Sequence, residues 1–170
     1  MSDVQTDLPS STNSSEERYR PNVAIILTSD KGEILICERI DENGMWQFPQ
    51  GGVDKGEGYL SALYRETWEE IGLEPQDYEL IDLRGGYKYK YPPGVREKKK
   101  KKHNCVGQEQ TYFLCKITSS KKRVNIDQSP AEFQNHKWIN PKEFKLKWLP
   151  EFKHEIYKKV FRDFFDCKIK

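Results

Sequence analysis

Residues 51–73 read GGVDKGEGYLSALYRETWEEIGL, and this stretch decides the fold of the 170-residue chain. Its glycines predict a turn, and the residues after them predict a helix over residues 59–71 that ends at Gly72 as its C-cap. On that helix Glu66, Glu69 and Glu70 stand at i, i+3 and i+4, so three negative charges share one face and repel one another. A cation bound to these carboxylates would remove the repulsion.

The residue types narrow the identity of that cation. Carboxylate oxygens at this density suit Mg²⁺, with Mn²⁺ as the other candidate. The chain has only three histidines and four scattered cysteines, without a paired cluster that would indicate zinc. A solvated charged helix face is the competing interpretation, because a run of like charges usually faces water.

The stretch resembles the Nudix box, G-x5-E-x7-R-E-U-x-E-E-x-G-U, starting at Gly51, and every fixed position matches. The resemblance implies an α/β fold, a Nudix α/β/α sandwich with a mixed β-sheet and the box as loop-helix-loop. It also implies a scaffold pair between Arg65 and Glu57. The metal ligands that it implies are Glu66 and Glu70 as the principal ones, Glu69 as a further ligand or water-ordering group, and the backbone carbonyl of Gly51 or Gln50.

Segments outside the box resemble the RNA pyrophosphohydrolase and diadenosine polyphosphate hydrolase branch of that family. They lie at residues 19–23, 46–52, 107–110 and 152–153, and Glu109 stands where the branch has lysine. The likeness implies that Glu132 is a carboxylate outside the box that binds metal or helps activate water. It implies substrate-binding roles for Arg20 and Arg39 at the 5′ phosphates or first nucleotide, for Phe152 and Lys153 beside a base, and for Gln50 in the metal loop.

Length and composition predict a single domain over residues 18–170 behind a disordered tail, residues 1–17, which is rich in Ser, Thr and acidic residues. No run is apolar enough for a membrane span, and the tail lacks the features of a signal peptide. The four cysteines are expected to be buried free thiols. We therefore expect a cytoplasmic protein, monomeric and without a membrane or DNA partner.

Apolar runs predict the other elements. The expected strands are residues 23–28 and 33–38, joined by a turn, then a short strand at 46–48, and further strands at 78–83, 111–117 and 136–139. A closing helix over residues 151–165 has Phe152, Ile156, Val160 and Phe164 along one packing face.

The segment 84–102 is a local polycation, with nine basic residues against Glu97, although the whole chain has a net charge of only +2. Tyr87, Tyr89 and Tyr91 alternate with two lysines, a pattern that fits base stacking and phosphate contact, and equally fits a half-exposed strand. The run Lys98–Lys102 is either an RNA contact or a solvated loop.

These features together predict a metal-dependent hydrolase of RNA 5′ ends that converts a triphosphate or diphosphate end to a monophosphate. Metal ions screen the anionic linkage and lower the pKa of bound water, so no Ser-His-Asp arrangement is needed. Hydrolysis of dinucleoside polyphosphates such as diadenosine tetraphosphate is the nearest alternative. A Nudix-shaped RNA-binding module without catalysis is a further one. Which of Glu69, Glu70 and Glu132 activates the water stays open.

Overall fold

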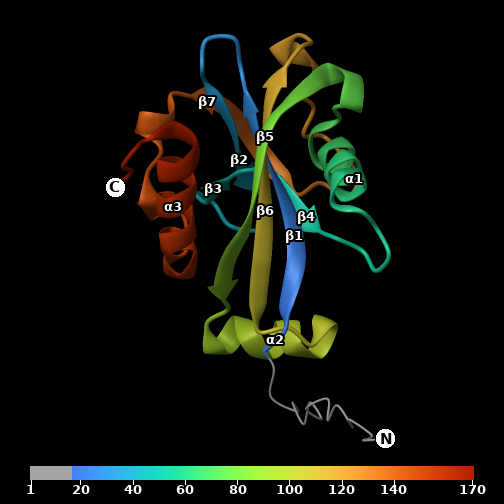
Figure 1. Ribbon diagram of the computed structural model, residues 1–170, viewed down its shortest axis with the longest axis vertical. Helices are drawn as coiled ribbons and strands as arrows, with labels where there is room; N and C mark the ends of the chain where they lie inside the picture. Colours follow the sequence, from blue (N-terminus) through green and yellow to red (C-terminus); the bar gives the residue numbers. More distant parts are fainter. Residues whose placement is uncertain (1–16) are drawn as a thin grey trace, which may run out of the picture.

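The computed structural model describes residues 17–170, which form a seven-stranded sheet with a helix against each face and a third helix across one end (Figure 1). The tail expected over residues 1–17 lies, apart from Glu17, outside the described residues. The strands are β1 (Tyr19–Thr28), β2 (Ile34–Arg39), β3 (Trp46–Gln47), β4 (Gln50–Gly52), β5 (Tyr78–Lys90), β6 (Gly107–Ile117) and β7 (Phe133–Ile139). The helices are α1 (Tyr59–Ile71), α2 (Pro93–His103) and α3 (His154–Phe165), with short 3₁₀ turns η1 (Pro75–Asp77), η2 (Lys121–Arg123), η3 (Pro141–Glu143), η4 (Leu146–Trp148) and η5 (Glu151–Lys153).

The sheet is mixed, as predicted. Its order is β3-β2-β1-β6-β5, with β4 paired to β1 and β7 paired to β2. The β1–β6 pair is parallel and continuous from Tyr19 opposite Gly107 to Thr28 opposite Lys116, whereas the other pairs are antiparallel. A short β4 therefore brings the glycine loop directly against the central strand.

Alternation along β1 gives the sheet two apolar faces. Val23, Ile25 and Leu27 belong to one core cluster, which includes Ala62 and Leu63 of α1. Ala24 and Ile26 point to the opposite face, where the second cluster includes Ile156, Tyr157, Val160 and Phe161 of α3. Figure 1 shows α1 and α3 on either side of the sheet, which confirms the expected sandwich.

The box forms the predicted loop and helix. Helix α1 has the bounds expected from the sequence, and Gly72 caps it with a left-handed φ of 68°. The Gly72 N–H donates to the Trp68 carbonyl at 3.0 Å. Glycine is the residue that takes this backbone conformation without a Cβ penalty.

Strand β4 was not predicted, and β1, β6 and β7 begin three or four residues before the expected strands. Two other parts of the chain differ more. Strand β5 does not stop at Leu83 but continues to Lys90, through a register shift between Arg84 and Tyr87 in which Gly86 has a φ of 84°. The lysine run is not a loop: it forms α2, which crosses the end of the sheet where β1 and β6 begin (Figure 1).

Two further expectations concern bonds and membranes. Cys37, Cys105, Cys115 and Cys167 are free and buried, as predicted. Within residues 17–170, every helix is too short or too polar to cross a bilayer.

Candidate active site

Arg65 lies among the carboxylates of the box. Its guanidinium donates to Glu57 at 2.8 and 2.9 Å and to the Gly52 carbonyl at 2.9 Å, which ties the glycine loop to α1. The same group lies 2.7 Å from Glu66 and 3.4 Å from Glu69, whose side chain is 53% exposed. Hydrogen bonds from Arg65 lower the pKa of the Glu57 carboxyl to about 2. Arg65 therefore fastens the loop to the helix.

Glu70 is the buried carboxylate of the group, with 4% of its surface exposed. Its Oε2 accepts the Gln50 backbone N–H at 3.0 Å, while Oε1 has no hydrogen-bond partner in the described part of the chain. Burial raises the pKa of Glu70 well above its ordinary value, and the negative charges of Glu132 and Glu66 raise it further. The ionised form of Glu70 is therefore unfavourable until a positive charge meets it.

Glu66 packs against the backbone of the glycine loop. A Cβ at residue 51 would overlap the Glu66 carboxylate, so any other residue there would displace that carboxylate. Burial raises the pKa of Glu66 despite the adjacent Arg65. Gly51 therefore has a steric role besides any role of its carbonyl.

This group fits a divalent cation held by oxygen. Among residues 17–170 no three Asp, Glu, His or Cys side chains converge closely enough to hold a metal ion as they stand. However, Glu66, Glu70 and Glu132 repel one another, and Oε1 of Glu70 and Oε1 of Gln50 are buried without a hydrogen-bond partner among these residues. A cation would neutralise the three carboxylates and bind the two oxygens that lack a partner. Hard oxygen donors of this kind suit Mg²⁺ or Mn²⁺.

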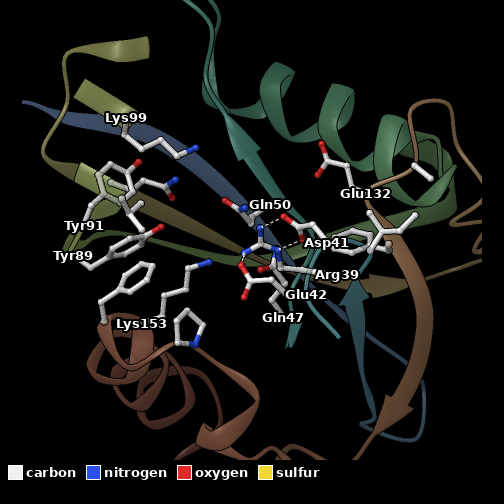
Figure 2. A pocket seen from close by; sticks show the side chains of 17 residues that line it. Arg39, Asp41, Glu42, Gln47, Gln50, Tyr89, Tyr91, Lys99, Glu132 and Lys153 are labelled. Carbon is white, nitrogen blue, oxygen red and sulfur yellow. Dashed lines mark hydrogen bonds and ion pairs between the residues drawn. The ribbon is translucent and has the colours of Figure 1, made fainter. Parts of the chain in front are cut away.

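A cavity of about 500 Å³ adjoins the carboxylates. Gln50 connects the two, because its backbone binds Glu70 and its side chain lines the cavity. Figure 2 shows side chains from β2, β4, β5, α2 and η5 around this space, with Glu132 at the edge nearest α1. Five of the residues predicted from the sequence to bind substrate or help activate water line this cavity: Arg39, Gln50, Glu132, Phe152 and Lys153.

Lys153 is the buried cation of the cavity. It is 9% exposed, and Figure 2 shows its ammonium group directed into the space between β2 and η5. Burial lowers its pKa to about 8, and the charge of Arg39 adds to this effect. The neighbouring Phe152 ring lies 5.5 Å from the Tyr89 ring, tilted by 46°. The pair provides an aromatic wall beside a positive charge.

Arg39 also lines the cavity, but its charge already has partners. Its guanidinium lies 2.6 and 2.9 Å from the two carboxylate oxygens of Asp41, and 3.5 Å from Glu42. A phosphate that binds Arg39 must therefore compete with these two carboxylates.

Arg20 lies beside the glycine loop and is not part of the cavity lining. Its guanidinium covers Gly52 so closely that a Cβ there would overlap it. The charge of Arg20 lowers the pKa of Lys99, a cavity residue, so Arg20 lies near the cavity without lining it.

The cavity lining also includes Lys99, Gln47 and Gln108, which were not predicted from the sequence as cavity residues. Figure 2 shows Lys99 extending from α2 toward the cavity. Burial lowers its pKa, and the positive charges of Lys102 and Arg20 lower it further. Five identical lysines give no sign of which one faces inward, so only the phase of the helix could have identified Lys99.

The tyrosine pattern has the structural explanation that the sequence left open. Tyr87, Tyr89 and Tyr91 are all under 9% exposed, while Lys88 and Lys90 between them are exposed on the other face of β5. Tyr89 and Tyr91 line the cavity, whereas Tyr87 donates its hydroxyl to Asp163 at 2.8 Å. Lys88 and Lys90 therefore cannot contact a nucleotide that stacks on Tyr89 in the cavity.

Comparison with known proteins gives consistent matches. A family model of the NUDIX domain matches residues 18–164. An RNA pyrophosphohydrolase of Francisella tularensis subsp. mediasiatica is 40% identical over 153 residues, covering 86% of this chain and 93% of the relative. One from Pasteurella multocida is 35% identical over 148 residues, covering 86% and 73%. Among solved structures, an Ap4A hydrolase of C. elegans in a binary complex superposes with a TM-score of 0.60 at 19% identity, covering 83% of this chain and 94% of that one. At that identity the likeness concerns the fold alone.

Proposed function

The chain belongs to the Nudix family, and we propose that it is a metal-dependent RNA pyrophosphohydrolase that converts a 5′ triphosphate or diphosphate end to a 5′ monophosphate. The observation that carries this proposal is the continuity between the box carboxylates and the cavity through Gln50 and Glu132. A pyrophosphate at the carboxylates leaves the attached nucleotide in a space with cations and aromatic rings. The names of the relatives support the same substrate.

Each group of residues has a distinct task in this proposal. Glu66 and Glu70, with Glu132, hold the cation, and the Gln50 N–H fixes the orientation of Glu70. Mg²⁺, the cation proposed here, supplies positive charge to the pyrophosphate oxygens and lowers the pKa of water when it is bound. Lys153 and Lys99 balance the remaining phosphate charge from two sides of the cavity.

Base recognition is assigned to the aromatic wall. The Phe152 ring lies against Tyr89 at one side of the cavity, and a base stacked there would place its 5′ phosphates toward Lys153. Arg39 would join them after release from Asp41 and Glu42. We also propose the cytoplasm as the location, because four buried free thiols suit a reducing compartment.

The test is a side-by-side measurement of turnover on three substrates in Mg²⁺. These are a 5′-triphosphorylated RNA, the same RNA with a 5′ diphosphate, and diadenosine tetraphosphate, with Glu70→Gln as the inactive control. The proposal expects a higher kcat/KM on one of the RNA ends than on the dinucleotide, with a 5′-monophosphorylated RNA as product. A preference for diadenosine tetraphosphate would establish the alternative activity. RNA binding without turnover of any substrate, in Mg²⁺ or Mn²⁺, would instead identify a non-catalytic module.

A further inference from the structure

A second cavity, of about 720 Å³, lies beside the segment that forms one wall of the catalytic cavity. Trp148 lines the second cavity, and Pro150, two residues later, lines the first. We call the second cavity the lysine groove, after the five lysines in its lining: Lys137, Lys142, Lys145, Lys168 and Lys170.

The lysine groove concentrates positive charge. Its lining contains five lysines and one acidic residue, Glu143, whereas the whole chain of 170 residues has a net charge of only +2. Within residues 17–170 none of the five lysines forms a salt bridge. Because like charges held close together repel, an anionic ligand with several charges would be favourable there.

Backbone contacts place Lys168 and Lys170 at the groove. Cys167 and Ile169 are buried in the core, so Lys168 and Lys170 alternate with them and face outward. The Lys170 carbonyl accepts the Leu146 N–H at 3.0 Å, which ties the end of the chain to the segment before Trp148. The groove is therefore assembled from segments that are far apart in the sequence.

Two aromatic residues, Phe144 and Trp148, line the groove. The Lys137 ammonium lies 4.2 Å from the centroid of the Trp46 ring and 4.5 Å from that of Trp148. These cation–π contacts hold Lys137 without a carboxylate partner and leave its charge available. A surface that combines ammonium groups with an indole ring matches a nucleic acid strand, whose phosphates meet the lysines while a base meets the ring.

The position of the groove indicates which part of a nucleic acid would bind. Phe133 of β7 lines the catalytic cavity and Lys137, four residues along the same strand, lines the groove, a span of roughly 13 Å. An RNA whose 5′ end occupies the catalytic cavity would need only a few nucleotides to cross the segment 148–150. A dinucleoside polyphosphate carries all its phosphates in one bridge, so it has no downstream backbone phosphates to place in the groove.

We propose that the lysine groove binds the single-stranded body of the RNA, a few nucleotides downstream of the 5′ end. The choice of RNA as occupant rests on the proposed function, whereas the polyanion chemistry of the groove does not. The groove would give the protein affinity for RNA over small substrates through contacts remote from the reacting phosphates.

The test compares two triple variants with the same change of charge. The groove variant carries Lys142→Gln, Lys145→Gln and Lys168→Gln. The control variant replaces Lys116, Lys122 and Lys159, which are exposed, lie outside the groove and form no salt bridge within residues 17–170. The ligand is a 5′-hydroxyl RNA of about ten nucleotides, within the range of one single-strand site, which carries no pyrophosphate.

The groove variant should bind this RNA about tenfold or more weakly, and its log–log salt dependence should flatten by about 2, because each lost phosphate contact contributes about 0.7. The control variant should keep the parent's affinity. With a 5′-triphosphorylated RNA, KM should rise in the groove variant while kcat and the turnover of diadenosine tetraphosphate stay unchanged.

Equal affinity and equal salt slope in the two triple variants would overturn the proposal. Loss of binding to phosphatidylserine vesicles without loss of RNA binding would also overturn it, and would assign the groove to a membrane surface. If the parent protein hydrolyses no RNA end, the proposed function fails, yet binding of the 5′-hydroxyl RNA still tests the groove.

Discussion

Replacement of Lys153 by methionine should make the protein more stable and a poorer enzyme. The ammonium group of Lys153 is buried, and its pKa falls from 10.5 to about 8. At 1.36 kcal/mol per unit, this fall means that the protonated form of Lys153 destabilises the fold by up to about 3 kcal/mol. Methionine has a similar length and no charge, so Lys153→Met should raise the free energy of unfolding at pH 7 by an amount of that order.

The pH dependence separates this cause from better packing. Between pH 8 and 10.5 the unfolded parent chain retains the proton on Lys153 while the folded protein loses it, so the stability of the parent rises with pH relative to the variant. The advantage of the variant should therefore shrink across this window. Cys37 and Cys115, whose thiol pKa values are raised by burial, have the opposite effect on stability but are common to both proteins.

Urea denaturation of both proteins from pH 7 to 10 measures this difference, and initial rates on 5′-triphosphorylated RNA give KM. KM should rise in Lys153→Met, and in the parent it should rise as the pH passes about 8, because the neutral amine attracts phosphate less. A variant that is no more stable than the parent at pH 7, or an advantage that does not depend on pH, would refute the assignment of Lys153 as a buried cation kept for ligand binding.

Glu70→Gln should lower turnover by about a hundredfold or more, because an amide is a weaker metal ligand than a carboxylate. It should also raise the melting temperature of the metal-free protein by removing a repelled buried charge; initial rates in Mg²⁺ and calorimetry measure both, and near-normal turnover would exclude Glu70 as a ligand. Glu57→Gln should lower both the rate and the melting temperature, since it removes the ion pair with Arg65; the contribution of Glu57 to stability in the parent should be lost as the pH falls from 4.5 toward 2. An unchanged melting temperature would indicate a purely catalytic Glu57. Lys99→Gln should raise KM for RNA about tenfold, because it removes one charge-assisted contact with the substrate. Lys98→Gln, the same change on the exposed side of α2, should leave KM unaltered. Equal effects in steady-state kinetics would show that the run acts only through its overall charge.

The box was predictable from sequence because its chemistry depends on spacing along one helix. Glu66 and Glu70 share a face of α1 whatever surrounds them, and Gly72 ends that helix through its own backbone freedom. Glu132 could be proposed only by resemblance, since its approach to Glu70 depends on how β7 pairs with β2.

Other features depend on partners distant in the sequence. Helix α2 lacks the apolar periodicity that predicts a helix, so a run of lysines indicated only charge. The strand was expected to end at Leu83, but β6 continues beside the chain to Lys90, and Gly86 takes a positive φ within the register shift. The pairing of Arg39 with Asp41 is local instead, but it depends on the turn after β2, which no motif specified.

The parallel pair of β1 and β6 has a consequence for synthesis on the ribosome. β1 is among the first parts of the domain to emerge, yet its partner begins only at Gly107, after the whole box has been translated. Until then one hydrogen-bonding edge of β1 stays open, beside side chains from Val23 to Leu27 that are almost fully buried in the finished protein. Such an edge is a template for pairing with other chains, so a nascent or prematurely ended polypeptide that stops before β6 should need a chaperone to stay unaggregated.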